Sequence, residues 1–207
     1  DHIHEVALVG GEPLLLPENE RLLDVIPPDA IVTLITNLSV DFGKNKIFHK
    51  LSQRHRVGWS MSFDNTDQRF EYVRHGGSWA LLKHNLAVVQ DLKATQGHWG
   101  GIHAVYNIYN ATRLCEIRQF AESTGTTVLW QNLFQPEHLD PFRLGPDVAA
   151  LAIAEIDKFY ALEIATPEET QFFDQSKTKY QEITLQAPHL AHKFKQHTHD
   201  TVSYTHL

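Results

Sequence analysis

Short apolar runs alternate along this chain with longer stretches whose apolar residues recur at helical spacing, and few folds accept that pattern. The alternation is typical of βα units, in which a helix returns the chain so that successive strands run parallel. A chain of 207 residues is long enough to bury one sizeable core around such a sheet. The predicted strands cover residues 3–9, 31–37, 57–63, 101–107 and 126–133.

Helices are predicted wherever apolar residues are spaced three and four apart. Pro27 and Pro28 end the first helix, since proline cannot continue one, and Asn110 is expected to be the N-cap of the fourth. A proline-rich loop at 135–146 leads to a helix around 148–162 and then to a polar segment. The apolar stripes are Leu22, Leu23 and Ile26; Ile47, Phe48 and Leu51; Trp79, Leu82, Leu86 and Val89; Leu114, Ile117 and Ala121; Ile153, Ile156 and Tyr160; and Leu190 with Phe194.

Five βα units in one direction fit either an open doubly wound sheet or part of a barrel. Polar residues on one face of the strands favour the barrel, because a sheet covered by helices on both sides is apolar on both faces. Ser60, Ser62 and Asp64 share one face of the third strand, and His103 and Asn107 share one face of the fourth. We therefore expect a barrel lumen that holds a ligand.

The carboxyl ends of the predicted strands carry polar residues, namely Glu12, Asn37, Asp64 and Asn107. Ligands of α/β folds bind at this edge of the sheet. The first strand ends in Gly10-Gly11-Glu12-Pro13 (GGEP), where two glycines expose the backbone and a carboxylate adds charge. Such a place can hold the ammonium group of a small molecule.

Structural interpretations of the same residues stay open. Glu12 could cap a helix that begins near Pro17, and Ser62 and Asp64 could be ordinary turn residues before Asn65.

The GGEP stretch resembles the second-strand motif of the radical S-adenosylmethionine (radical SAM) family. Thr36-Asn37 and Ser62-Phe63-Asp64, which end the next two strands, are also similar to that family. The resemblance runs from GGEP to about Gln131. Residues 72–79 and the loop at 136–146 look like the subgroup called twitch-containing radical SAM proteins.

The resemblance implies an α/β fold, a partial (β/α)6 TIM-like barrel that lacks its first βα unit and carries a helical C-terminal extension. It places the barrel at 1–133 and the proline-rich and helical region at 134–201. It also implies the family's activity: reductive cleavage of S-adenosylmethionine at a 4Fe–4S cluster, giving a 5′-deoxyadenosyl radical that abstracts hydrogen from a substrate. The implied partners are an electron donor such as flavodoxin or ferredoxin and a small-molecule, peptide or nucleobase substrate.

The resemblance also implies roles for individual residues. Gly10, Gly11 and Glu12 would accept hydrogen bonds from the methionine ammonium, and Pro13 would shape the turn that follows. Ribose hydroxyls would bind Ser62 and Asp64, with Ser60 as a helper. From the neighbouring strands, Asn37 and Asn107 would face the cofactor or the substrate.

The family's CxxxCxxC loop is absent from the sequence, which contains only Cys115. We expect the cluster cysteines to lie upstream of Asp1, Cys115 to be a structural thiol, and the fragment alone to be inactive. The last six residues, 202–207 (VSYTHL), are interpreted as a translated sequencing adapter.

The remaining composition excludes several classes of protein. A net charge of -7 argues against a broad nucleic-acid-binding face, and no apolar run approaches the roughly 18 residues of a membrane span. A single cysteine favours a cytoplasmic protein. The histidine pairs at 2 and 4, 189 and 192, and 197 and 199 lack the companion ligands of a zinc site. Two alternatives stay open: a non-catalytic SAM-type binding barrel and an unrelated α/β enzyme.

Overall fold

The computed structural model describes residues 3–183, 190 and 192–198. The segment interpreted as an adapter, at 202–207, lies outside the described residues, as do His2, His189 and His199 of the three histidine pairs.

Five parallel strands form one sheet in the sequential order β1-β2-β3-β4-β5. A doubly wound sheet reverses its strand order at a switch point; this sheet does not, and its sequential order is consistent with part of a barrel. All five predicted strands are confirmed, each to within two residues at either end. The strands are β1 Glu5–Leu8, β2 Ile31–Thr36, β3 Val57–Ser62, β4 Trp99–Tyr106 and β5 Val128–Asn132.

Two compact units divide the described chain. Unit 1 holds residues 3–63, Gly77–His103 and Ala121–Val128, and unit 2 holds Asp64–Gly76, Ala104–Phe120 and the described residues from Leu129 onward. The division follows packing rather than sequence order, since β4 begins in unit 1 and ends in unit 2.

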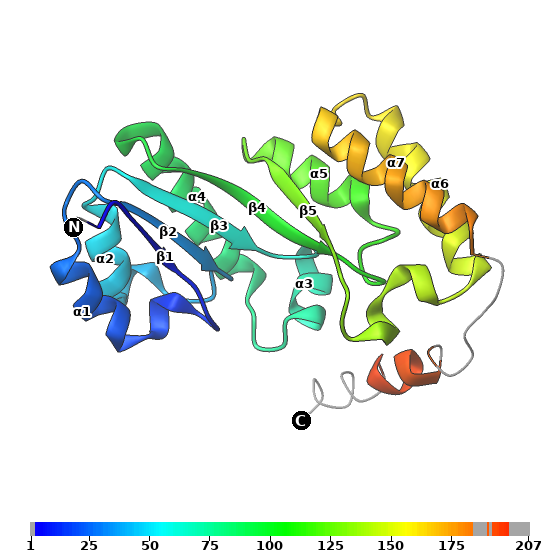
Figure 1. The fold of residues 1–207 in the computed structure, drawn as a ribbon, viewed down its shortest axis with the longest axis horizontal. Helices are drawn as coiled ribbons and strands as arrows, with labels where there is room; N and C mark the ends of the chain where they lie inside the picture. The colour runs from blue at the N-terminus through cyan, green and yellow to red at the C-terminus, as the bar shows by residue number, and fades with distance from the viewer. Residues whose placement is uncertain (1–2, 184–189, 191, 199–207) are drawn as a thin grey trace. The chain divides into compact units, whose positions relative to one another are not determined.

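Unit 1 packs three helices, α1 (Pro17–Val25), α2 (Lys46–Ser52) and α4 (Trp79–Gln96), as the stripes predicted. Figure 1 shows α2 and α4 behind strands β1 to β3. Trp59 of β3 lies in this core, with its ring 6.0 Å from Phe42 and 6.1 Å from Phe48. The buried strand residues include Val32, Leu34, Trp59, Met61 and Ile102, and the buried residues of the helices and turns include Phe42, Phe48, Leu82, Leu86 and Val89.

Unit 2 contains α3 (Asp67–Val73), α5 (Leu114–Ser123), α6 (Pro146–Ala161) and α7 (Pro167–Gln181). The stripes predicted α5 and α6, but α3 and α7 were not predicted. Helix α7 has no strong apolar stripe because its composition is mostly polar. Its N-terminus does carry a sequence signal, since Thr166 and Glu169 form a capping box.

The expectation that Asn110 caps the fourth predicted helix is wrong, because that helix, α5, begins at Leu114. The Asn110 side chain instead accepts from the backbone amide of Asn107 at 2.9 Å and donates to the Val105 carbonyl at 2.8 Å. Asparagine satisfies turn backbone as readily as a helix start, and sequence spacing does not separate the two roles.

Within the described part of the chain, no helix combines the length and the apolar character needed to span a bilayer.

Candidate functional site

Most residues on one face of the unit 1 sheet are small or polar, and their side chains are only partly covered. In β3, Trp59 and Met61 are buried, while Ser60 and Ser62 on the opposite face are half-buried. Among the described residues, neither serine hydroxyl has a hydrogen-bond partner. We call this surface the open face; it comprises Thr33, Ile35, Ser60, Ser62, Gly101 and His103.

Strand register arranges the open face in rows. Ser60 is the register partner of Ile35 on one side and of Gly101 on the other. Ser62 is the register partner of His103, and the half-buried His103 imidazole is a polar group that the predicted set of site residues did not include.

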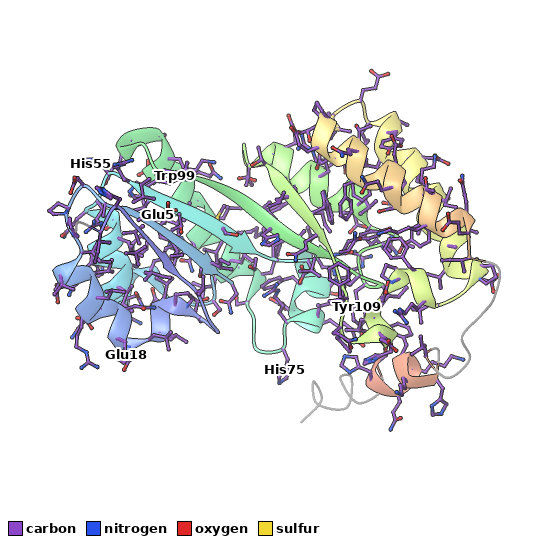
Figure 2. All side chains as sticks on the ribbon, in the orientation of Figure 1. Glu5, Glu18, His55, His75, Trp99 and Tyr109 are labelled. Atoms are coloured by element: carbon purple, nitrogen blue, oxygen red, sulfur yellow. The ribbon has the colours of Figure 1, made fainter. Side chains whose placement is uncertain are left out.

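Trp99 fills the row nearest the amino ends of the strands. This residue begins β4 (Figure 2) and is the register partner of Gly58. A Cβ atom placed on Gly58 would lie 2.8 Å from the Trp99 indole Nε1, so only glycine leaves room for the ring. The rows of Ser60 and Ser62 therefore form the part of the open face nearer the carboxyl ends.

Glu12 lies just beyond the end of β1, and the residue is 9% exposed. Oε1 accepts from the Leu14 amide at 3.2 Å, and Oε2 accepts from the Asn37 amide at 2.9 Å. The Thr36 hydroxyl lies 2.9 and 3.0 Å from the two oxygens. These contacts join the ends of β1 and β2 through one carboxylate.

All three donors to Glu12 are neutral groups, and among the described residues no lysine, arginine or histidine forms an ion pair with it. A carboxylate offers about four lone-pair sites, so three donors leave capacity for one more. A buried anion favours a cation as that further partner.

The GGEP backbone is exposed beside this carboxylate. Gly10 has a φ of 118°, a region that other residues rarely adopt. A Cβ on Gly10 or Gly11 would meet no atom within 4 Å, so both glycines border open space. Pro13 begins a short 3-10 turn, Pro13–Leu15, that Glu12 caps through Leu14. The alternative in which Glu12 caps the helix near Pro17 is therefore wrong in detail: α1 has Leu16 at its N-cap, without a side-chain bond.

Asn37 follows β2 and is half-buried. Its Oδ1 accepts from the Ser39 amide at 2.9 Å, which closes a local turn, while its own amide donates to Glu12. Seven predicted site residues thus belong to unit 1, and among them Glu12 and Asn37 are in direct contact; the seven are Gly10, Gly11, Glu12, Pro13, Asn37, Ser60 and Ser62.

Asp64 belongs to unit 2 and is already bonded there. Its Oδ1 accepts from the Val105 amide at 2.8 Å, and its Oδ2 pairs with Arg74 Nη2 at 2.9 Å. The residue is 8% exposed, and its contact with a ribose stays a prediction.

Asn107, also in unit 2, uses its side chain to build the turn after β4. Its Oδ1 accepts from the Tyr109 amide and its Nδ2 donates to the Val105 carbonyl, both at 2.8 Å. Its role toward a cofactor or substrate likewise stays a prediction.

Cys115 is the one side chain of this sequence that could supply a thiolate ligand to an iron–sulfur cluster. Cys115 on α5 is half-buried, and burial, followed by the nearby Glu155 carboxylate, raises the pKa of its thiol to about 11. Across residues 3–183, 190 and 192–198, no group of three or more His, Cys, Asp or Glu side chains could hold a metal ion. The described residues therefore do not fit a 4Fe–4S cluster.

No family model matches the sequence, and no curated protein matches it. The fold is similar to that of two radical SAM enzymes. Native anSMEcpe with bound AdoMet (S-adenosylmethionine) and Cp18Cys peptide aligns with a TM-score of 0.52 and 14% identity, over 77% of this chain and 47% of that one. SuiB of Streptococcus suis aligns with a TM-score of 0.56 and 16% identity, over 78% of this chain and 37% of that one. This chain thus spans about half or less of their length.

Proposed function

We propose that this chain is the S-adenosylmethionine-binding part of a radical SAM enzyme. The observation that carries the proposal is the Glu12 carboxylate: it is buried on neutral donors, has no cation among the described residues, and lies beside two exposed glycines at the carboxyl end of a parallel strand. The similar fold of anSMEcpe, a structure that holds AdoMet, supports it.

Each part of the ligand has a counterpart in unit 1. The methionine ammonium would supply the missing cation and donate to Glu12 and to the backbone carbonyls of Gly10 and Gly11. Ser62, with Ser60 as its helper, would bind the ribose hydroxyls, because these side chains are half-buried and unpartnered on the open face. Asn37 would contact the ligand from the end of β2.

Asp64 would still contact the ribose, and Asn107 the cofactor or the substrate, but both side chains also have a structural role. Their side chains hold the turns around β4 in unit 2, so we propose that they orient backbone as well as contact ligand. An intact radical SAM enzyme also needs an iron–sulfur cluster, which supplies the electron that cleaves the sulfonium. The described residues hold no ligand set for it, so they bind and orient S-adenosylmethionine and carry no assigned step of the cleavage.

Titration calorimetry of the 207-residue chain with S-adenosylmethionine tests the proposal. Ser60→Leu fills the middle row of the open face and should abolish binding. Thr33→Leu is the matched control, since Thr33 is the register partner of Gly58, whose row Trp99 already fills.

We expect the native chain and Thr33→Leu to bind with similar affinity. The absence of saturable binding to the native chain, or equal binding by both leucine variants, would refute the proposed site.

A further inference from the structure

Asn85 of α4 is fully buried in unit 1, and its side-chain amide bridges two backbone carbonyls. Nδ2 donates to the carbonyl of Leu38 at 2.9 Å and to that of Val40 at 2.7 Å. Both carbonyls belong to the turn that follows β2. One side chain from a helix therefore holds a turn more than 40 residues earlier in the chain.

The turn held by Asn85 has an uncommon backbone. Leu38 has a φ of 55°, in the left-handed region, and its side chain is fully buried. A leucine in this conformation persists only where its surroundings hold it. The two carbonyl contacts of Asn85 link this turn to helix α4.

A continuous set of hydrogen bonds runs from this turn to Glu12. The Leu38 amide donates to the Thr36 hydroxyl at 3.1 Å, and that hydroxyl donates to the Glu12 carboxylate. The Asn37 amide, on the same turn, donates to Glu12 Oε2 at 2.9 Å. One of the three donors that orient the Glu12 carboxylate, the Asn37 amide, therefore comes from the turn that Asn85 holds, and a second, the Thr36 hydroxyl at the end of β2, accepts from the Leu38 amide of that turn.

The orientation of the Asn85 amide carries a cost. With Nδ2 committed to two carbonyls, Oδ1 is buried and has no hydrogen-bond partner among the described residues. An unpaired buried acceptor destabilises a fold, so packing alone does not account for an asparagine here. Its distinctive contribution is the geometry of the turn.

We propose that Asn85 is a positioning residue for the Glu12 carboxylate, and that recognition of a ligand's ammonium group depends on it. The proposal rests on the proposed function, because Glu12 is the group that would receive the ammonium. It assigns Asn85 an effect on one part of the ligand only, the amino-acid part.

Two ligands separate this effect from a general structural one. S-adenosylhomocysteine carries the ammonium, whereas 5′-methylthioadenosine has the same nucleoside without the amino-acid part. Asn85→Leu keeps the size of the side chain and removes both donors. Gln90→Leu is the control: it is on the same helix and removes a side-chain bond to Thr126, which is not linked to Glu12.

We expect Asn85→Leu to weaken S-adenosylhomocysteine about tenfold and to leave 5′-methylthioadenosine within about twofold. Gln90→Leu should change neither affinity. Glu12→Gln should cause the same selective loss, and the double variant should lose less than the sum of the two, because both changes act on one contact.

The outcomes are distinguishable. If the native chain binds neither ligand, the proposed function fails, and the inference fails with it. If the native chain binds both and Asn85→Leu weakens both equally or neither, the function stands and Asn85 is not a positioning residue. Should Asn85→Leu not fold, Thr36→Val interrupts the same set of hydrogen bonds next to Glu12, and an equal loss for both ligands would again overturn the inference.

Discussion

His98 and Trp59 form a buried hydrogen bond in which the Nδ1 atom of the imidazole accepts from the indole Nε1 at 3.0 Å. An indole N–H can only donate, so Nδ1 of His98 carries no proton. The other ring nitrogen, Nε2, lies 2.7 Å from the Arg54 carbonyl and must be the protonated one. The indole contact requires the neutral ring, because a protonated Nδ1 could not accept from the indole N–H.

This pair makes the stability of unit 1 dependent on pH. Burial lowers the pKa of His98 below its ordinary 6.5; the hydrogen bond to the Arg54 carbonyl opposes this shift in part, and the positive charge of a protonated His55 adds to the lowering. The unfolded chain therefore takes up this proton first, so the contribution is complete above pH 6.5 and declines as pH falls toward the lower folded pKa. Urea unfolding at pH 7.5 and 5.5 checks this. His98→Phe should show a smaller drop in unfolding free energy between the two pH values than the native chain, and equal drops would contradict the assignment.

Arg118 and Glu169 form a buried ion pair that joins α5 to α7 in unit 2. Arg118 Nε lies 3.3 Å from Glu169 Oε2, and the two residues are 8% and 2% exposed. Removal of one partner leaves a buried charge, so we expect Arg118→Met to lower the unfolding free energy by about 3 kcal/mol. Arg113→Met is the control, because its pair with Glu116 is exposed and should contribute less than about 1 kcal/mol. Chemical denaturation measures both, and similar losses would argue against a specific role for the buried pair.

Gly100 allows β3 and β4 to approach each other closely. Its φ is 133°, and a Cβ at this position would lie 1.9 Å from the backbone oxygen of Trp59. Backbone cannot yield as a flexible side chain does, so we expect Gly100→Ala to destabilise by about 3 kcal/mol or more.

Gly97 offers the comparison for that experiment. Its φ is also positive, at 73°, but an added Cβ would meet no atom within 4 Å. Gly97→Ala should therefore cost only the conformational strain, about 1 kcal/mol. Thermal or urea unfolding that ranks the two alanine variants in the opposite order would contradict the close approach at Gly100.

Cys115 is the only cysteine in the chain and reports directly on its surroundings. Since burial and Glu155 raise the pKa of its thiol to about 11, little thiolate is present at pH 8, and the thiolate is the reactive form. Iodoacetamide should modify the folded chain at least about tenfold more slowly than the urea-unfolded chain, and the folded rate should still rise between pH 8 and 10. Mass spectrometry follows the reaction, and equal rates in both states would contradict the raised pKa.

Local pattern was sufficient to place the sheet's strands and most of its helices. Large apolar and small polar residues alternate through Trp59, Ser60, Met61 and Ser62. Because successive side chains of a strand point to opposite faces, this alternation places the apolar residues on one face and the serines on the other. Helical stripes located α1, α2, α4, α5 and α6 by the same local logic. Segments without a strong apolar period were not predicted. Helix α7 is one of them: its composition is mostly polar, although Thr166 and Glu169 have the sequence pattern of a capping box.

By itself, then, the sequence determined the βα alternation, the polar face of β3 and the acid with two glycines at the end of β1. Only the tertiary structure decided which groups meet there. The Glu12 carboxylate contacts Thr36, 24 residues away, and Asn85 holds the Leu38 turn from a distance of 47 residues. Such contacts depend on which strands are neighbours and on how the helix packs beneath them, and no local period of two or 3.6 residues encodes either.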